Sequence, residues 1–384
     1  MVKLILCIII SLIMTLSLVA CGKDEYNPEP FDETSSSECE TSWEAVENIT
    51  VGWNLGNTLD SCGDWLSQSP PEAYETAWGN PLTTKDMIAA VKDAGFNAVR
   101  VPVTWNDHFD DNGVIDEAWF DRVQEVVDYV MSLDMYCILN MHHDAGSDGW
   151  LRASTANYAD NGDTYAKIWE QIADRFKDYG EKLIFESINE ILDENSNWNP
   201  PSQDAIEGLS LYVQRFVDTI RAGEGYNKTR NLVLMTYAGS AGDALSNFVM
   251  PEDTVKAHLI IEIHNYDPVD FCWRDSWLTS TSFWGSDADI AEMDAYFADT
   301  YSRAQQFDAP LIIGEWGSEG KDDNDKDRAR HASYFVKKAQ ECGFAVFWWD
   351  CGHVALIDRE NSKVAHPEIV QAIMESAGVS TEQE

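Results

Sequence analysis

Basic side chains are scarce in this sequence. Only 26 of the 384 residues are Lys or Arg, against 67 Asp or Glu, which sets the formal net charge at -41. Such a charge repels a phosphate backbone and an anionic membrane surface, so we expect no nucleic-acid partner. The acidic residues are spread along the chain rather than massed in one block, a pattern typical of a solvated surface that keeps a protein soluble.

Paired cysteine spacing is also absent, because none of the eight cysteines belongs to a Cys-x-x-Cys motif. Cys7 lies in the apolar N-terminal run, Cys21 follows that run, and Cys39 lies in the polar stretch after it. The others are odd in number: Cys62, Cys137, Cys272, Cys342 and Cys351. This indicates neither a zinc site nor a disulfide framework, and buried thiols are expected instead.

The N-terminus carries an apolar run from Leu4 to Val19, preceded by Lys3. A short positive region, an apolar core and small residues before a cleavage point predict an export signal over residues 1–20, to be removed, rather than a membrane span. Leu18-Val-Ala-Cys21 also resembles a bacterial lipobox, in which Cys21 would be lipidated. An ordinary secretory signal is the alternative. We therefore expect an exported protein, either a cell-surface lipoprotein touching the membrane only through this lipid or a secreted one.

Residues 21–42 are rich in Glu, Asp, Ser and Pro, with almost no aliphatic side chains. Such a segment buries too little apolar surface to offset its ordering entropy, which predicts a tether. Residues 43–377 then form one predicted domain, and 378–384 a polar tail. No tandem repeat or low-complexity segment interrupts the domain.

Short apolar runs alternate with helical periodicity across the domain, which predicts an α/β fold with a parallel sheet. Eight such strand, helix units favour closure into a (β/α)8 barrel, a TIM barrel, whose active face is formed by the loops after the strands. The predicted strands lie near Ile49–Trp53, Ala98–Val101, Tyr136–Asn140, Leu183–Phe185, Leu232–Thr236, Leu259–Ile263, Leu311–Ile313 and Phe344–Phe347.

Two of these runs each deliver a glutamate where the strand emerges into a loop. Glu190 follows the run that begins at Leu183, and Glu315 follows the run that begins at Leu311. Two carboxylates that converge on one bond are what acetal hydrolysis needs, one to protonate the leaving oxygen and one to attack or to activate water. Seven of the eight strand ends carry polar or aromatic groups of this kind, so we expect an active site at that rim.

Several motifs in register resemble glycoside hydrolase family 5, over nearly the whole domain from about 43 to 377. They are Gly52-Trp-Asn-Leu-Gly-Asn-Thr58, Trp78-Gly-Asn-Pro81, Gly95-Phe-Asn-Ala-Val-Arg-Val-Pro102, His142-His-Asp144, Asn189-Glu190, His264-Asn-Tyr266 and Gly314-Glu-Trp-Gly317. The first two motifs are most similar to those of the endo-β-1,4-glucanase and xyloglucanase members. Ile191, where many members have proline, and the aromatic-poor loop 238–243 depart from the pattern.

The resemblance implies catalytic roles for two residues, with Glu190 as acid/base and Glu315 as nucleophile of a retaining mechanism. Carboxyls held about 5 Å apart are costly to ionise together, so we expect Glu190 to hold the proton. Arg100 and Tyr266 are then expected to keep Glu315 ionised. The resemblance implies substrate contacts for Asn57, Asp60, Arg100, His142, His143, Asn189, His264, Tyr266 and Trp349. Among these, Asn189 resembles the residue that binds the sugar 2-hydroxyl, and Trp349 the platform beneath the cleaved sugar.

No cofactor and no metal are expected. His142, His143 and Asp144 could ligate zinc, but neighbouring side chains on a strand point to opposite faces. Fifteen tryptophans are many for this length, and sugar rings stack on indoles. Trp119 and Trp169 are expected in the core. Candidates for extending the cleft, of which half could be core, are Trp65, Trp150, Trp198, Trp273, Trp277, Trp284 and Trp316.

The sequence thus predicts a monomeric, retaining endo-β-1,4-glucanase that cleaves internal bonds of cellulose, mixed-linkage glucan or xyloglucan. A β-mannanase on the same scaffold and a non-catalytic glycan-binding surface lipoprotein are the alternatives. A metal-dependent hydrolase is a third, which insensitivity to a chelator would dismiss.

Overall fold

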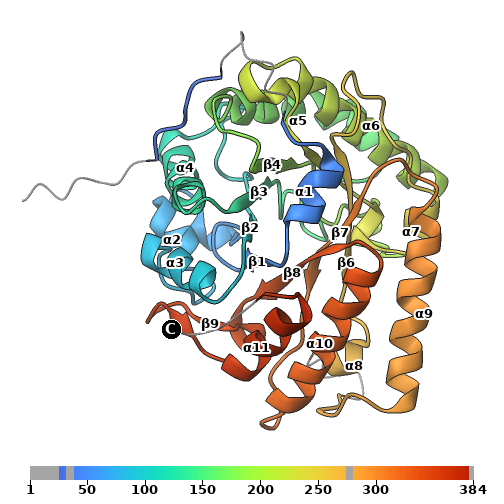
Figure 1. Ribbon diagram of the computed structural model, residues 1–384. Helices are drawn as coiled ribbons and strands as arrows, with labels where there is room; N and C mark the ends of the chain where they lie inside the picture. The colour runs from blue at the N-terminus through green and yellow to red at the C-terminus, as the bar shows by residue number, and fades with distance from the viewer. Residues whose placement is uncertain (1–25, 32–38, 274–279, 380–384) are drawn as a thin grey trace, which may run out of the picture.

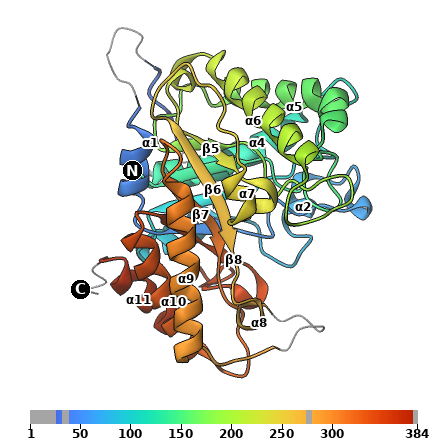
Figure 2. The same ribbon diagram turned by 90° about the vertical axis from the view of Figure 1, so that its right-hand side faces the viewer.

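The computed structural model describes residues 26–31, 39–273 and 280–379. Within them, eight parallel strands close into one barrel in chain order, which confirms the predicted (β/α)8 fold (Figures 1 and 2). The barrel strands are β1 (Gly52–Leu55), β2 (Ala98–Val101), β3 (Tyr136–Asn140), β4 (Leu183–Glu186), β5 (Leu232–Met235), β6 (Leu259–Asn265), β7 (Leu311–Trp316) and β8 (Ala345–Asp350). A small antiparallel pair, β9 (Ile357–Asp358) and β10 (Lys363–Val364), follows the last barrel strand.

Helices surround the barrel, and short ones lie in the loops at its ends (Figure 1). In the described ranges they are α1 (Ser42–Asn48), α2 (Pro71–Glu75), α3 (Lys85–Asp93), α4 (Glu117–Ser132), α5 (Thr155–Arg175), α6 (Gln203–Arg221), α7 (Asp243–Ser246), α8 (Val269–Cys272), α9 (Asp287–Ala304), α10 (Asp325–Glu341) and α11 (Pro367–Ser376). The 3-10 segments are η1 (Asp64–Leu66), η2 (Gly225–Lys228), η3 (Tyr237–Gly239) and η4 (Gly352–Val354).

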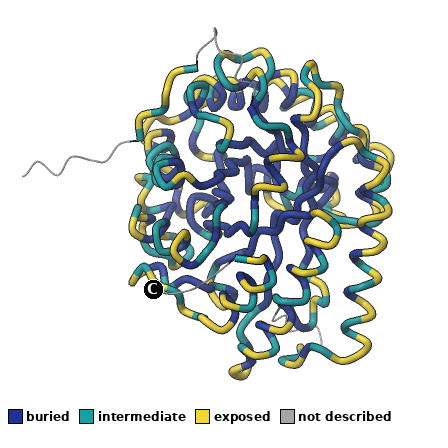
Figure 3. Tube along the Cα trace, in the orientation of Figure 1, coloured by how far each residue is buried: buried dark blue, intermediate teal, exposed yellow. Residues whose placement is uncertain are grey.

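Serine side chains begin three of the long outer helices. Ser154, Ser202 and Ser286 each accept a hydrogen bond from a backbone N–H in the first turn, of α5, α6 and α9 respectively. These bonds satisfy N–H groups that have no partner inside the helix. The buried stripe of each helix then faces the barrel, while its outer face is exposed (Figure 3).

The inside of the barrel changes from apolar to polar along the strands. Near the strand starts, Ile138, Ile184 and Val233 belong to a buried cluster with Ile260, Ile312 and Phe347. Helix α1 closes this end, because Ala45, Val46 and Ile49 belong to the same cluster. Since side chains alternate along a strand, the next inward position lies two residues further on. Those positions hold Arg100, Asn140, Glu186 and Glu262, all fully buried.

The predicted signal and Cys21 lie outside the described residues. Of the predicted tether, residues 26–31 and 39–42 are described, and the first of these segments contacts the domain through two aromatic side chains. The ring centroid of Tyr26 lies 5.4 Å from that of Tyr179, and Phe31 lies 5.0 Å from Tyr226. No helix in the described part of the chain is both long and apolar enough to cross a membrane.

Candidate active site

Two strands bring the predicted pair of carboxylates together at the carboxyl end of the barrel. Glu315 lies within β7, and Glu190 lies four residues beyond β4 in a left-handed backbone conformation with φ of 31°. One carboxylate oxygen of Glu190, one of Glu315 and one ring nitrogen of His264 all lie within 4.8 Å of one another. Carboxyls that act as acid/base and nucleophile across a sugar in retaining enzymes are about 5 to 5.5 Å apart.

Glu315 is buried and held by two donors. Arg100 Nη1 donates to its Oε1 at 2.7 Å, and the Tyr266 hydroxyl donates to its Oε2 at 3.0 Å. Burial raises the pKa of Glu315, while the positive charges of His264 and Arg100 act to lower it, and Glu190 adds to the rise. The two donors that were expected to support the ionised form are therefore in place, against a desolvation cost.

His264 does more than line the site. Its Nδ1 lies 2.7 Å from Glu190 Oε1 and 3.6 Å from Glu315 Oε2. Burial acts to lower the pKa of His264, but the carboxylates of Glu315, Glu190 and Glu262 outweigh it and raise the pKa to about 10. The imidazole thus lies between the two candidate catalytic groups, and the nearby carboxylates favour a positive charge on it.

Arg100 organises the floor of the site. It is fully buried, and Glu186 accepts from its Nε at 2.6 Å and from its Nη2 at 2.7 Å. The same Nη2 donates to Asn189 Oδ1 at 2.8 Å, and Nη1 donates to Asn54 Oδ1 at 3.0 Å. A planar guanidinium has five N–H donors, which match this group of acceptor oxygens. Its bond to Asn189 fixes the orientation of that side chain beside Glu190.

Four residues of this floor were missed by sequence reasoning: Asn54, Asn140, Glu186 and Glu262. Asn140 Nδ2 donates to Glu186 Oε1 at 2.9 Å and lies 3.0 Å from His142 Nδ1. The sequence held a signal for such residues. It was a polar residue at the end of a buried strand, two positions after an apolar residue that faces the barrel interior.

A second group of predicted residues forms one wall beside this floor. The rings of His142 and Trp349 stack, with centroids 5.7 Å apart and an interplanar angle of 8°. The His143 ring lies 4.6 Å from the His142 ring, and its Nε2 lies 3.8 Å from Asp60 Oδ2. Asp60 is buried and accepts from the backbone N–H of Asn57 at 3.0 Å. These five residues are brought together by the loops after β1 and β3 and by β8.

The reason given for separating His142 from His143 was wrong. β3 ends at Asn140, so the alternation of side chains along a strand no longer applies to the two histidines. Together with Asp60 their ligand atoms lie within 4.8 Å of one another. Asp144 turns elsewhere, because it accepts from the backbone N–H of Trp105 and from Trp150 Nε1, both at 2.8 Å.

The tryptophans divide between rim and core. Trp65 and Trp198 are 72% and 52% exposed, and the Trp273 ring lies 4.8 Å from that of Tyr266. Trp284 and Trp316 are fully buried, so of the candidates for extending the cleft these two belong to the core. Trp316 follows the inward Glu315 and so faces the helices, where it stacks on Phe335. Trp119 and Trp169 are buried as predicted, and Trp277 lies outside the described residues.

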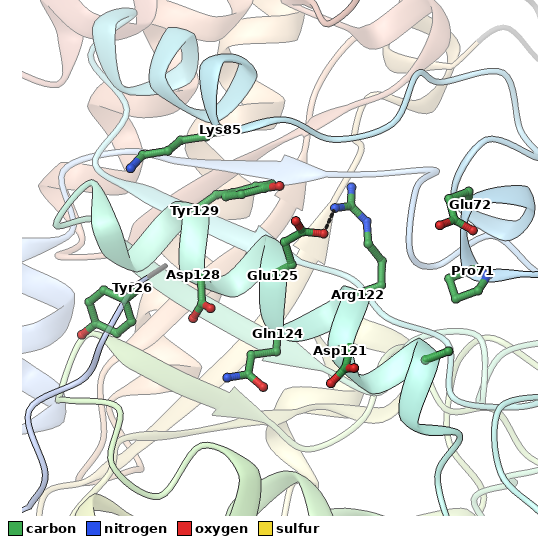
Figure 4. Close-up of a pocket in the computed structure, with 11 residues that line it drawn as sticks. Tyr26, Pro71, Glu72, Lys85, Asp121, Arg122, Gln124, Glu125, Asp128 and Tyr129 are labelled. Carbon is green, nitrogen blue, oxygen red and sulfur yellow. Dashed lines mark hydrogen bonds and ion pairs between the residues drawn. The ribbon is translucent and has the colours of Figure 1, made fainter. Parts of the chain in front are cut away.

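A cavity of about 820 Å³ lies away from this site, on the outer side of α4 (Figure 4). Its charged lining residues are mostly paired, for example Arg122 with Glu125 at 2.6 Å. Arg122 also bonds the buried Glu75 at 2.8 Å through both Nε and Nη2. This groove shows no converging carboxylates, so the barrel mouth is the better candidate for chemistry.

Comparison with known proteins places the geometry in context. Residues 62–354 match the model of the cellulase family, glycosyl hydrolase family 5. The chain is 37% identical over 358 residues to endoglucanase B of Clostridium cellulovorans, covering 89% of this chain and 77% of that protein. It is 40% identical over 347 residues to a cellulase/esterase of Acetivibrio thermocellus, covering 87% of this chain but only 40% of that longer protein.

Solved structures agree with these relatives. A broad-specificity endoglucanase of Ruminococcus champanellensis with bound cellotriose superposes with a TM-score of 0.83 at 39% identity, covering 88% of this chain and 100% of that one. A mutant family 5 enzyme of Prevotella bryantii in complex with a xyloglucan tetradecasaccharide gives 0.81 at 37% identity, covering 89% and 100%.

Proposed function

Because this chain belongs to glycoside hydrolase family 5, we propose that it is a retaining endo-β-1,4-glucanase acting on β-glucans. The observation that carries the proposal is the approach of Glu190 and Glu315 to within 4.8 Å, with Arg100 and Tyr266 bonded to Glu315. All of these residues come from one chain, which supports a monomer as the active form.

In the proposed first step, Glu315 attacks the anomeric carbon while Glu190 gives its proton to the leaving glycosidic oxygen. The C–O bond breaks, and a glycosyl ester forms on Glu315. In the second step Glu190, now a carboxylate, takes a proton from water, whose oxygen attacks the same carbon and releases Glu315. Two inversions leave the product with the configuration of the substrate.

The charge on Glu315 governs how the two residues exchange roles. Esterification removes this negative charge, which lies beside Glu190, so Glu190 ionises more easily and can act as a base. Arg100 stays paired with Glu186 in both steps. Its buried positive charge therefore keeps a negative partner after Glu315 has been esterified.

We propose glucans rather than mannans as substrates. Mannose differs from glucose by having an axial 2-hydroxyl, which would stand in a different position from Asn189, the proposed partner of that hydroxyl. Asn189 Oδ1 accepts from Arg100 Nη2 at 2.8 Å. The ligands of the two solved neighbours, cellotriose and xyloglucan, support cellulose-like chains with and without branches.

The test is incubation of the purified protein with carboxymethylcellulose, lichenan, xyloglucan and mannan, with sizing of the products over time. We expect medium-length oligosaccharides early in the reaction from the glucans, and little from mannan. NMR of the first product should show the β-anomer before mutarotation. An α-anomer would contradict the retaining mechanism, and mannan as the best substrate would contradict the glucan assignment.

We also propose that Cys21 carries a lipid that holds the enzyme at a membrane surface. The support is the sequence around Cys21, since that residue lies outside the described structure. Mass spectrometry of the mature N-terminus from membrane fractions should find an acylated Cys21. An unmodified N-terminus downstream of it would contradict the proposal.

A further inference from the structure

Glu262 is a buried carboxylate that the proposed mechanism does not use. It lies on β6, two residues before His264, and both of its carboxylate oxygens are inaccessible to solvent. Oε1 lies 3.3 Å from Arg100 Nε and 3.4 Å from His264 Nε2. Neither of its oxygens makes a hydrogen bond of standard geometry, and His264 Nε2, which lies next to Oε1, makes none either.

The other charged groups of the floor have partners of their own. Glu186, from β4, already accepts both of the short bonds from Arg100 Nε and Nη2. Glu315 accepts from Arg100 Nη1. Arg100 is therefore hydrogen-bonded to two other carboxylates and meets Glu262 only as a neighbouring charge at 3.3 Å, while His264 is the second cation beside Glu262.

The neighbouring strand β7 leaves room for the carboxylate of Glu262. β6 and β7 shift register at this point, since Ile263 pairs with Ile313 but His264 pairs with Glu315. Gly314 is the residue skipped by the shift, and a Cβ there would lie 1.5 Å from Glu262 Oε1. A glycine is therefore required directly before Glu315 for Glu262 to occupy its place.

We propose that Glu262 is a positioning residue that keeps the His264 imidazole doubly protonated, with Nε2–H toward Glu262 and Nδ1–H donating to Glu190. Glu262, His264 and Glu190 then form a row of hydrogen-bonding groups across the mouth of the barrel, with the imidazole between two carboxyl groups. The kinetic consequence of this arrangement rests on the proposed function, whereas the protonation state of His264 can be measured without it.

The electrostatics of the surrounding elements agree with this assignment. His264 faces Glu262 on its own strand, Glu190 after β4 and Glu315 on β7, against the positive Arg100 on β2, while His142 after β3 has its pKa lowered, chiefly by burial. Burial raises the pKa of Glu262 to about 7, helped by Glu186 and opposed by Arg100 and His264. Above that pH the anionic Glu262 holds the second proton of His264 most strongly.

A charged imidazole would assist the first step of the reaction. When Glu190 has given up its proton, the Nδ1–H at 2.7 Å stabilises the resulting carboxylate. Because His264 also lies 3.6 Å from Glu315, its charge offsets part of the repulsion between the two carboxylates. Loss of the Glu262 charge lowers the affinity of His264 for its second proton, so the pKa of His264 should fall.

The experiment is nitrogen NMR of the histidine side chains of the full protein across pH, with the His264 signals assigned by their loss in His264→Gln. In the unaltered protein we expect imidazolium shifts for His264 at pH 7. In Glu262→Gln the titration midpoint of His264 should move down by about one pH unit or more, the size expected for removing a charge at this distance. The alkaline limb of kcat/KM should move in the same direction.

Glu75→Gln is the matched control, because Glu75 is an equally buried carboxylate paired with Arg122 outside the barrel. It should lower thermal stability while leaving the His264 midpoint unchanged. A neutral His264 at pH 7 in the unaltered protein, or the same midpoint in Glu262→Gln, would overturn the proposal. The NMR measurement on the unaltered protein tests the protonation state of His264 even if Glu262→Gln does not fold. Failure to hydrolyse any glucan would refute the proposed function but not the proposed protonation state of His264.

Discussion

At the scale of single residues, Glu315 is the group whose removal is most informative. Glu315→Ala should lower hydrolysis by on the order of 10⁴-fold, because no nucleophile is left to form the glycosyl ester. The substitution removes the carboxylate that Arg100 Nη1 bonds, so we expect a small anion to take its place beside the guanidinium. Added azide should therefore restore turnover and give a product of inverted configuration, measured by NMR of the glycosyl azide. Absence of rescue would count against Glu315 as nucleophile.

Glycine at position 314 provides a second test at this scale. Gly314→Ala places a methyl group on Glu262, which must displace either that carboxylate or the backbone that carries Glu315. We expect kcat/KM to fall by about 100-fold or more, since small displacements of catalytic groups are costly. Gly180→Ala is the control, because nothing lies within 4 Å of a Cβ there. Equal activities of the two variants would contradict the close fit.

At the scale of elements, the buried imidazole of His108 couples the loop after β2 to helix α4. It stacks on Trp119, with centroids 3.7 Å apart, and burial lowers its pKa to about 4. The unfolded chain binds the proton with a pKa near 6.5, so protonation favours unfolding. Its contribution to the free energy of unfolding, on the order of 3 kcal/mol, is complete above pH 6.5 and lost as the pH falls toward 4.

His108→Phe should therefore flatten the decline in the free energy of unfolding between pH 6.5 and 4, measured by urea denaturation at several pH values. His353→Phe is the control, because His353 is exposed and should leave the slope unchanged. A slope that is the same in His108→Phe as in the parent would show that the acid sensitivity arises elsewhere.

The elements themselves were largely predictable, and their ends were not. Apolar runs located all eight strands, but β4 was expected to end at Phe185 and continues to Glu186, and β6 was expected to end at Ile263 and continues to Asn265. Both strands continue because the added residues Glu186 and His264 have charged partners, Arg100 and Glu190 respectively. The change from apolar to polar residues predicted where each strand ends. Contacts with distant segments of the chain determine where it actually ends. No local pattern identifies which of 67 acidic residues these cations will meet.

At the scale of the whole molecule, two exposed tryptophans lie on separate loops at the mouth of the barrel, where we expect them to bind sugar units of a long chain. Trp65 follows β1 and Trp198 follows β4, three strands away around the barrel. Replacing either by Ala should raise KM several-fold for lichenan, with little change in hydrolysis of a short aryl cellobioside, because each stacking contact is worth about 1 kcal/mol.

Trp43→Ala is the matched control for that prediction. Trp43 is 49% exposed but lies on α1, at the opposite end of the barrel. Kinetics with the polymer and with the short substrate separate the two cases. If the change at Trp43 altered KM for lichenan as much as the changes at Trp65 and Trp198, the tryptophans would not mark a sugar path.

The closure of the barrel base by α1 also sets the direction in which the molecule faces. The described residues before α1 pack against Tyr179 and Tyr226, both in loops that lead into strand starts. The polypeptide therefore reaches the domain from the side opposite the glutamates. If the protein is held at a surface by its N-terminal segment, the strand-start end of the barrel would face that surface. The carboxyl end, with the two glutamates, would then face the medium, where it is accessible to long glucan chains.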